Sequence, residues 1–292
     1  MSQKSATLIG FIAIVLWSLL ALFTAASGEI PPLQLSAITF ALGGFLGMIR
    51  WLQKPSRIRI LKQPIKIWFL GIFGLFGYHF AYFTALKNAP PVEASLIAFL
   101  WPLLIVLFSA FLPGEKLRLH HIGGAILGFL GAALIVTKGD IVSFETQYIY
   151  GYSMALLCAF IWSSYSVISR RFAETPTDIV TGFCLATSVL SLIAHLLLET
   201  TVWPSTNLQW IAILCLGMGP VGLAFYAWDY GVKKGDIQVL GASSYLAPLL
   251  STLILIIAGF AELSIVIVVA CLLITVGAII AAKDLIFSNN SL

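Results

Sequence analysis

The sequence alternates between long apolar stretches and short polar connections along its whole length. A helix needs about 20 predominantly apolar residues to cross a hydrocarbon core about 30 Å thick. Ten stretches meet that requirement, and we expect each to span a membrane: residues 6–27, 32–52, 66–87, 91–112, 119–138, 147–170, 178–199, 208–231, 237–259 and 263–286. The connections are too short to hold a soluble domain. The pattern therefore predicts an all-α integral membrane protein with ten transmembrane helices.

The composition agrees with this prediction. Of the 292 residues, 60% are hydrophobic and only 10% are charged, whereas a soluble domain carries about 25% charged residues. The four cysteines all lie inside apolar stretches, without the spacing of a disulfide framework or a metal site. We interpret them as small core residues, and we expect neither a metal nor a cofactor.

The basic residues predict an orientation in the membrane. With ten spans, fourteen of the 16 Lys and Arg residues fall on one side, and only Lys87 and Lys138 fall on the other. Basic residues concentrate in cytoplasmic connections, so both termini are expected in the cytoplasm and the chain in the plasma (inner) membrane. The formal net charge of +4 then reflects topology. It gives no reason to expect a nucleic-acid partner.

The two halves of the sequence resemble each other at a nearly constant shift of 146 residues. We therefore expect two five-helix repeats, residues 1–140 and 141–292. Because five is odd, the second repeat would enter the membrane upside down, which gives an inverted repeat typical of transporters. The matches are LWPLL (100–104) with LAPLL (246–250), Lys87 with Lys233, and Gly131-Ala132 with Gly277-Ala278.

Three prolines lie well inside predicted spans: Pro102, Pro220 and Pro248. Proline removes a backbone donor and breaks the helical hydrogen-bond ladder. In lipid such a break persists where other helices, polar side chains or a cavity satisfy the freed groups. Pro102 and Pro248 occupy equivalent places in the two halves. We expect these points to bend during gating, with a simple packing kink as the alternative.

Aromatic and polar residues near the middle of the predicted spans form a candidate substrate site. Tryptophan and tyrosine usually prefer membrane interfaces, so rings at mid-span indicate a protein-lined interior with polar contacts. An ionisable histidine inside a span also favours the bundle interior. The alternative for each residue is plain helix packing. The candidates are Trp17, His79, Tyr82, Trp101, Trp162, Tyr165, Ser244 and Tyr245.

Other polar residues give weaker indications. Asp229, toward the cytoplasmic end of span eight, is a candidate for a coupling proton or for gating, although an acid near an interface has a snorkelling or capping alternative. His120 and His121 precede span five and are expected to be solvated. The pattern Gly124-x-x-x-Gly128 indicates close helix packing or a dimer contact. We expect a monomer or a weak homodimer.

Several motifs resemble the EamA-type permeases of the drug/metabolite transporter superfamily, over nearly the whole chain. They are most similar to the YddG-type aromatic amino-acid exporters. The resemblance implies a substrate cavity between the two halves and cytoplasmic termini. Two positions depart from the expected pattern, because Phe99 stands where a tyrosine is expected and Asp229 where an asparagine is expected. The matching motifs are LWS (16–18), LWP (100–102), IWSSY (161–165), AWDYG (227–231) and SSYLAPLLS (243–251).

These observations predict a secondary transporter that exports small amphipathic metabolites, such as aromatic or other neutral amino acids, by alternating access around an aromatic-lined cavity. The lipid bilayer and a small-molecule substrate are its expected partners. A permease of the same fold for drugs, sugars or nucleosides is the nearest alternative. An intramembrane lipid-modifying enzyme is a remote one, since the sequence holds no H-E-x-x-H, G-x-S-x-G or P-loop motif. We therefore expect no enzyme.

Overall fold

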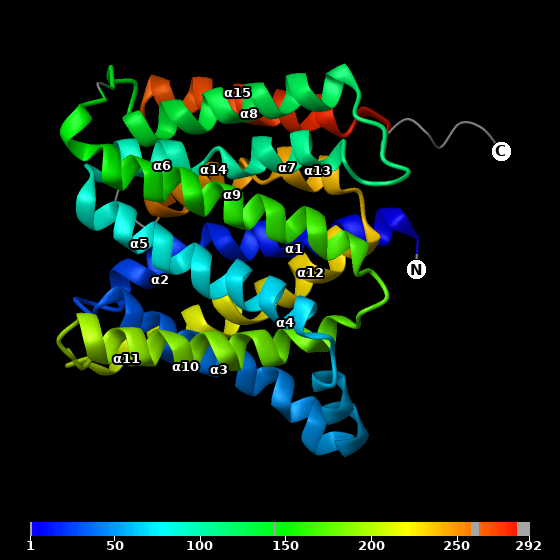
Figure 1. The fold of residues 1–292 in the computed structure, drawn as a ribbon. Helices are drawn as coiled ribbons and strands as arrows, with labels where there is room; N and C mark the ends of the chain where they lie inside the picture. Colours follow the sequence, from blue (N-terminus) through cyan, green and yellow to red (C-terminus); the bar gives the residue numbers. More distant parts are fainter. Residues whose placement is uncertain (1, 143, 258–262, 285–292) are drawn as a thin grey trace.

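The computed structural model describes residues 2–142, 144–257 and 263–284, and within these ranges all regular secondary structure is helical (Figure 1). The α-helices are α1 (Gln3–Ser18), α2 (Leu20–Ala26), α3 (Pro32–Gln53), α4 (Ile65–Ile72), α5 (Tyr78–Asn88), α6 (Pro91–Ala98), α7 (Trp101–Ser109), α8 (Leu119–Thr137), α9 (Ile149–Arg171), α10 (Val180–Leu198), α11 (Asn207–Met218), α12 (Ala224–Lys234), α13 (Ile237–Ser243), α14 (Leu246–Ile257) and α15 (Ile265–Ala281). Two π-helical segments are η2 (Phe73–Gly77) and η5 (Gly219–Leu223), and three 3₁₀ segments are η1 (Pro55–Leu61), η3 (Thr146–Tyr148) and η4 (Thr177–Ile179).

Eight helical stretches among the described residues are long and apolar enough to cross a membrane, which identifies an integral membrane protein. Two further predicted spans, 91–112 and 263–286, contain only shorter apolar helices, Glu93–Ser109 and Ile265–Ala281. The predicted count of ten is therefore not confirmed. The ends of the predicted spans 237–259 and 263–286 lie outside the described residues.

Several of the long stretches are interrupted, and the interruptions recur at a nearly constant spacing. The π segment η2 joins α4 to α5, and η5 joins α11 to α12 exactly 146 residues later in the chain. The break between α6 and α7 has a counterpart between α13 and α14. A π segment adds one residue to a turn and is common at functional sites.

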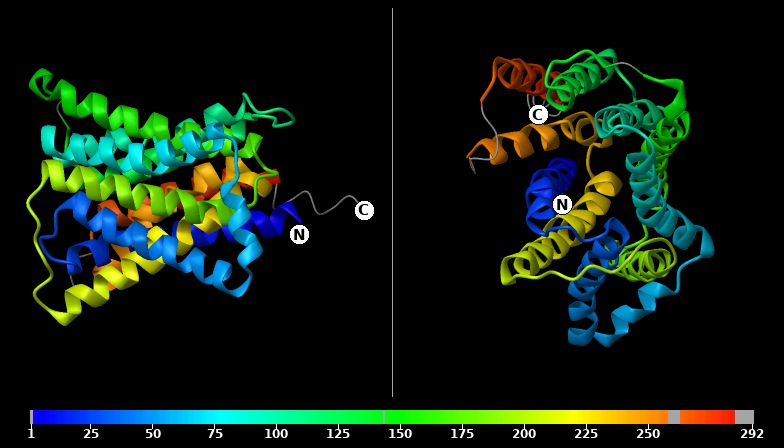
Figure 2. Two further views of the ribbon diagram at one scale, coloured as in Figure 1. Left: turned by 60° about the horizontal axis from the view of Figure 1, so that its bottom comes forward. Right: turned by 90° about the vertical axis from the view of Figure 1, so that its left-hand side faces the viewer.

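The helices pack in pairs that are far apart in the sequence. α8 lies along α15 at one edge of the bundle, and α3 lies along α10 at the opposite edge (Figures 1 and 2). Between these edges α1 packs against α12, and α5 packs against α9. These central helices carry most of the candidate site residues.

The small residues of α8 are used in packing within the chain. A Cβ on Gly124 would lie 2.4 Å from the carbonyl oxygen of Gly277, so the backbones of α8 and α15 touch. A Cβ on Gly128 would lie 2.4 Å from the ring of Tyr245. The Gly124-x-x-x-Gly128 pattern thus packs against α15 and against Tyr245, which lies between α13 and α14.

The bundle has two ends that differ in their polar contacts. We call the end that holds the start of α1 and the ends of α9 and α12 the near end (Figure 1). The opposite end, which holds the start of α3 and the ends of α5 and α10, is the far end.

Candidate functional site

Four tryptophans from four helices meet in the middle of the bundle. Trp17 of α1, Trp101 of α7, Trp162 of α9 and Trp228 of α12 form the tryptophan cluster, in which every pair of ring centroids lies between 5.1 and 6.3 Å apart. Most of these pairs are edge-to-face or tilted, which is the favoured arrangement of aromatic rings. Trp17, Trp101 and Trp162 were predicted to lie together, and in the structure they do.

Hydrogen bonds from two indole groups fix the rings of this cluster. The Trp17 N–H donates to the carbonyl oxygen of Pro220 at 3.1 Å. Pro220 lies in the π segment η5, so the irregular backbone supplies an acceptor to the cluster. The Trp228 N–H donates to the hydroxyl of Ser166 at 3.0 Å. Both donors are thereby satisfied inside the protein, as buried indoles require.

Phenylalanines connect His79 to the cluster. Phe225 contacts Trp17 and Trp162 and stacks on Phe40 at 5.5 Å. The ring of His79 meets Phe40 edge-on at 5.1 Å. Its Nδ1 donates to the carbonyl oxygen of Leu75 at 2.7 Å, since a carbonyl can only accept.

A tyrosine connects Tyr82 to the same cluster. Tyr78 lies 5.5 Å from Trp162 and stacks on Tyr82 at 6.1 Å. The Tyr82 hydroxyl lies 3.4 Å from the hydroxyl of Ser95. Sequence reasoning did not select Trp228, Phe225, Phe40 or Tyr78. The motif AWDYG (227–231) contains Trp228, without indicating which face of the helix it occupies.

Tyr165 joins the cluster, whereas Ser244 and Tyr245 have other contacts. Tyr165 is buried, and its ring lies 5.2 Å from Trp162. The buried hydroxyl of Ser244 donates to the carbonyl oxygen of Leu240 in the preceding turn. The Ser244 hydroxyl is therefore satisfied locally at the break between α13 and α14.

The hydroxyl of Tyr245 is inserted into the break between α6 and α7. It donates to the carbonyl oxygen of Phe99 at 3.1 Å and accepts the N–H of Leu103 at 3.2 Å. In a continuous helix that N–H and that carbonyl would bond each other. Pro102 stands between them and lacks an N–H. One side chain from the second half thus satisfies the two backbone groups separated in the first half.

Pro248, like Pro102, lies in the first turn of the helix that follows a break. It is the third residue of α14, just after the break at Ser244 and Tyr245. A proline in the first turn of a helix forfeits no intrahelical hydrogen bond. The two halves thus share a helix break, followed by a helix with a proline in its first turn.

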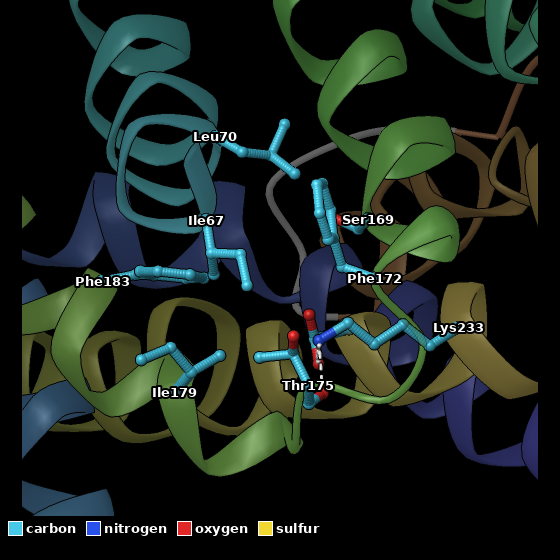
Figure 3. A pocket seen from close by; sticks show the side chains of 9 residues that line it. Ile67, Leu70, Ser169, Phe172, Thr175, Ile179, Phe183 and Lys233 are labelled. Atoms are coloured by element: carbon cyan, nitrogen blue, oxygen red, sulfur yellow. Dashed lines mark hydrogen bonds and ion pairs between the residues drawn. The ribbon is translucent and has the colours of Figure 1, made fainter. Parts of the chain in front are cut away.

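Asp229 lies in a buried ion pair near the near end of the bundle. Its side chain is 1% exposed, and its carboxylate accepts from Lys233 at 2.9 Å and from the Thr177 hydroxyl at 2.8 Å. Lys233 also donates to the carbonyl oxygen of Thr175. The snorkelling or capping alternative does not fit this buried pair, and a role for Asp229 in coupling or gating stays a prediction. A cavity of about 10 Å³ adjoins the pair, lined by Ile67, Leu70, Ser169, Phe172, Thr175, Ile179 and Phe183 (Figure 3). That volume is on the order of one water molecule.

Arginines also tie the helix ends together at the near end. Arg170 of α9 donates to the carbonyl oxygens of Val232 and Gly235 at 2.9 and 2.7 Å and pairs with Glu115. Arg171 donates to the carbonyl oxygen of Phe111 at 2.9 Å. These bonds link α9 to α12 and to the connection after α7, so the near end is closed.

The far end holds a second buried carboxylate, that of Glu199. It accepts the N–H groups of Leu33 and Gln34 at the start of α3, and it lies 3.0 Å from Nδ1 of His195. Lys87 lies 3.6 Å from it. Beside Lys87 is a cleft of about 230 Å³. The volume of this cleft is more than twenty times that of the near-end cavity.

The histidines at the start of α8 differ from expectation. His121 is 4% exposed, and its Nδ1 accepts the backbone N–H of Arg118, so it is buried and caps its own helix. Ligand atoms of His120, His121 and Asp284 lie within 4.8 Å of one another. The guanidinium of Arg118 forms an ion pair with the carboxylate of Asp284 at 2.7 Å, and its positive charge would repel a metal ion there. We assign no metal site to this group.

Comparison with known proteins gives relatives that match nearly the whole chain. An aromatic amino acid exporter YddG from Ancylobacter novellus is 54% identical over 282 residues, covering 96% of this chain and 98% of the relative. The exporter of the same name from Salmonella typhimurium is 28% identical, covering 86% of this chain and 88% of the relative. A solved crystal structure with 54% sequence identity superposes with a TM-score of 0.92 over 97% of this chain and 98% of that one.

The family comparison matches the chain twice. The model of the EamA-like transporter family matches residues 4–137 and again residues 149–282. Together the matches cover most of the sequence, and each contains two members of the tryptophan cluster. The chain belongs to the EamA-like transporter family.

Proposed function

We propose that the protein exports aromatic and other neutral amino acids by alternating access around the tryptophan cluster. The observation that carries the proposal is this cluster itself, which brings together rings from α1, α7, α9 and α12 in the middle of a membrane bundle. The 54% identity with an aromatic amino acid exporter supports the same cargo class. An amino acid offers an ammonium group for the ring faces and an apolar side chain for their edges.

The remaining candidates surround the cluster in ways that suit such a cargo. His79 and Tyr82 carry polar groups next to rings that reach Trp162 and Phe225. Tyr165 packs on Trp162. Ser244 and Tyr245 would act through the helix breaks, which bend with Pro102, Pro220 and Pro248 as the site opens. Asp229 is paired with Lys233, so its part is gating at the near end.

Two inverted repeats of five spans, residues 1–140 and 141–292, account for the packing. The second and seventh predicted spans pair as α3 with α10, and the fifth and tenth pair as α8 with α15. α1 packs against α12, and the helices equivalent to them in the other half, α9 and α5, also pack against each other. Such reciprocal pairs, with the 146-residue recurrence of the π segments, support a pseudo-twofold arrangement.

The orientation follows from the basic residues. The near end carries most of the Lys and Arg residues, including Arg170 and Lys233, whereas Lys87 belongs to the far end. We therefore place the near end and both termini in the cytoplasm. With the near end closed and a cleft at the far end, the conformation corresponds to one that opens away from the cytoplasm.

Counterflow of L-phenylalanine in proteoliposomes tests this function. Trp101→Ala should slow exchange by about tenfold, because it removes a ring that contacts three others and the cation–π face it presents. Trp203→Ala is the matched control, since Trp203 is 64% exposed and stacks on Trp210 outside the cluster. Unchanged exchange in Trp101→Ala would contradict the central site.

A competition panel separates the cargo classes. Aromatic and neutral amino acids should inhibit phenylalanine exchange, whereas sugars and nucleosides should not. If a nucleoside or a sugar competes better than tryptophan or phenylalanine, the protein is a permease of the same fold for that cargo. Chemical conversion of a solute without net movement would instead indicate an enzyme.

A further inference from the structure

We infer that the cleft at the far end is a second amino-acid subsite, in which Lys87 binds the carboxylate of the exported solute after it leaves the tryptophan cluster. This inference rests on the proposed function for its cargo. It adds a binding site that is distinct from the central one.

One face of α5 forms the main wall of the cleft. Phe80, Phe83, Thr84, Lys87 and Asn88 line it, and their spacing of three or four residues places them on one side of the helix. Leu33 of α3 and Leu198 of α10 also line the cleft. The wall thus presents two aromatic rings, which suit the side chain of an aromatic amino acid. It also presents one ammonium group, which suits the carboxylate of that amino acid.

The size of the cleft suits such a solute. Its volume is about 230 Å³, whereas a cavity of about 150 Å³ already admits a benzene molecule. The near-end cavity of about 10 Å³ has no such capacity.

Lys87 is available for a ligand because Glu199 is satisfied by other donors. Two backbone N–H groups at the start of α3 and the imidazole of His195 surround that carboxylate, which is only 4% exposed. The Lys87 nitrogen lies 3.6 Å away, beyond the usual 2.7–3.2 Å range of an N–H···O hydrogen bond. The Lys87 side chain is 54% exposed. A carboxylate in the cleft would gain a charge-assisted hydrogen bond without displacing a buried one.

A chain of rings leads from the tryptophan cluster to this cleft. Phe225 contacts the cluster, Phe40 stacks on Phe225, and His79 meets Phe40. Phe83, which lines the cleft, lies 6.0 Å from His79. The rings therefore form a continuous series of contacts from the central site to the wall that carries Lys87.

Thiol labelling at the cleft tests the inference directly. Thr84→Cys introduces a reactive group into the wall, and its reaction with a membrane-impermeant maleimide is followed in proteoliposomes, with the unsubstituted protein as the background for the native cysteines. L-phenylalanine should slow the labelling. Phenethylamine has the same ring and ammonium but no carboxylate, so it should protect at least about tenfold less well.

Lys87→Gln in the Thr84→Cys background should raise the phenylalanine concentration needed for half-protection by about tenfold. Lys234→Gln is the matched control, because Lys234 also lies 3.6 Å from a glutamate and is 45% exposed, but at the near end. It should leave protection unchanged. Equal protection by phenethylamine, or undiminished protection in Lys87→Gln, would overturn the inference.

Two further outcomes distinguish this inference from lipid binding and from the proposed function. Vesicles of phosphatidylcholine are compared with vesicles that contain phosphatidylglycerol. If phosphatidylglycerol, and not phenylalanine, slows the labelling, a lipid headgroup occupies the cleft and the inference is wrong. If phenylalanine protects Thr84→Cys but wild-type vesicles show no phenylalanine counterflow, the proposed function fails while the subsite stands. If wild-type vesicles show phenylalanine counterflow but phenylalanine does not protect Thr84→Cys, the proposed function stands and the subsite inference is wrong.

Discussion

Lys87 and Lys233 occupy the same place in the two halves, 146 residues apart, but their ammonium groups have different surroundings. Lys233 is buried and bonded to Asp229, four residues earlier on the same helix. The residue four before Lys87 is Phe83, so Lys87 has no carboxylate on its own helix and stays half exposed beside a cleft. The residue one turn before the lysine, Asp229 in one half and Phe83 in the other, thus distinguishes the closed near end from the open far end.

The difference shows how similar halves acquire different tasks. In an inverted repeat each end of the bundle is built from opposite ends of equivalent spans. A carboxylate one turn before the lysine allows Lys233 to be buried as an ion pair, whereas Phe83 leaves Lys87 half exposed, 3.6 Å from Glu199. The two ends can then favour different states without any change of backbone.

The largest expected effect is that of Asp229→Asn. It leaves Lys233 as a buried cation without its carboxylate, which costs about 3–5 kcal/mol of stability. Thermal unfolding of the purified protein in detergent measures this loss. The double variant Asp229→Asn/Lys233→Met should recover most of it, because no buried charge remains. A single variant as stable as wild type would show that the pair does not hold the near end closed.

An intermediate effect is expected for Arg170→Met. The variant removes two hydrogen bonds to the carbonyl oxygens of Val232 and Gly235 and the ion pair with Glu115. Hydrogen bonds from a charged donor contribute about 1.5–3 kcal/mol, so the near end should open at least about tenfold more often. Maleimide labelling of Ser169→Cys, which lines the near-end cavity, reports this opening. Arg171→Met, which loses one bond, should give a smaller increase.

The smallest effect is expected for Lys87→Gln on stability. A half-exposed pair at 3.6 Å contributes about 0–1 kcal/mol, and Glu199 keeps its other donors. The melting temperature in detergent should therefore change little, in contrast with Asp229→Asn. A loss as large as that of Asp229→Asn would mean that the two lysines have equivalent structural roles, and the contrast between the ends would fail.

The positions of the spans and part of the site could be predicted from the sequence. Lipid forces every backbone group into helical hydrogen bonds, so apolar length alone locates most of the helices. Trp17, Trp101 and Trp162 were predicted because a ring at mid-span must face protein. Each of the three lies on a helix that the hydropathy pattern locates.

The facing of residues after a π segment could not be predicted in this way. A π turn adds a residue and shifts the phase of the helical face by on the order of 100°. Tyr78 directly follows η2, and Phe225 and Trp228 follow η5, so helical spacing counted from the start of the span does not give the side that they occupy. The pairing of Lys87 with Glu199 joins residues more than a hundred positions apart, and no local pattern reports it.

The hydroxyl of Tyr245 has a consequence for biogenesis. The break at Phe99 and Leu103 is completed by an atom that the ribosome adds about 140 residues later. At about 5–20 residues per second, the first half waits roughly 10–30 s in the bilayer with these two backbone groups lacking their final partner. The first half therefore cannot reach its finished form alone.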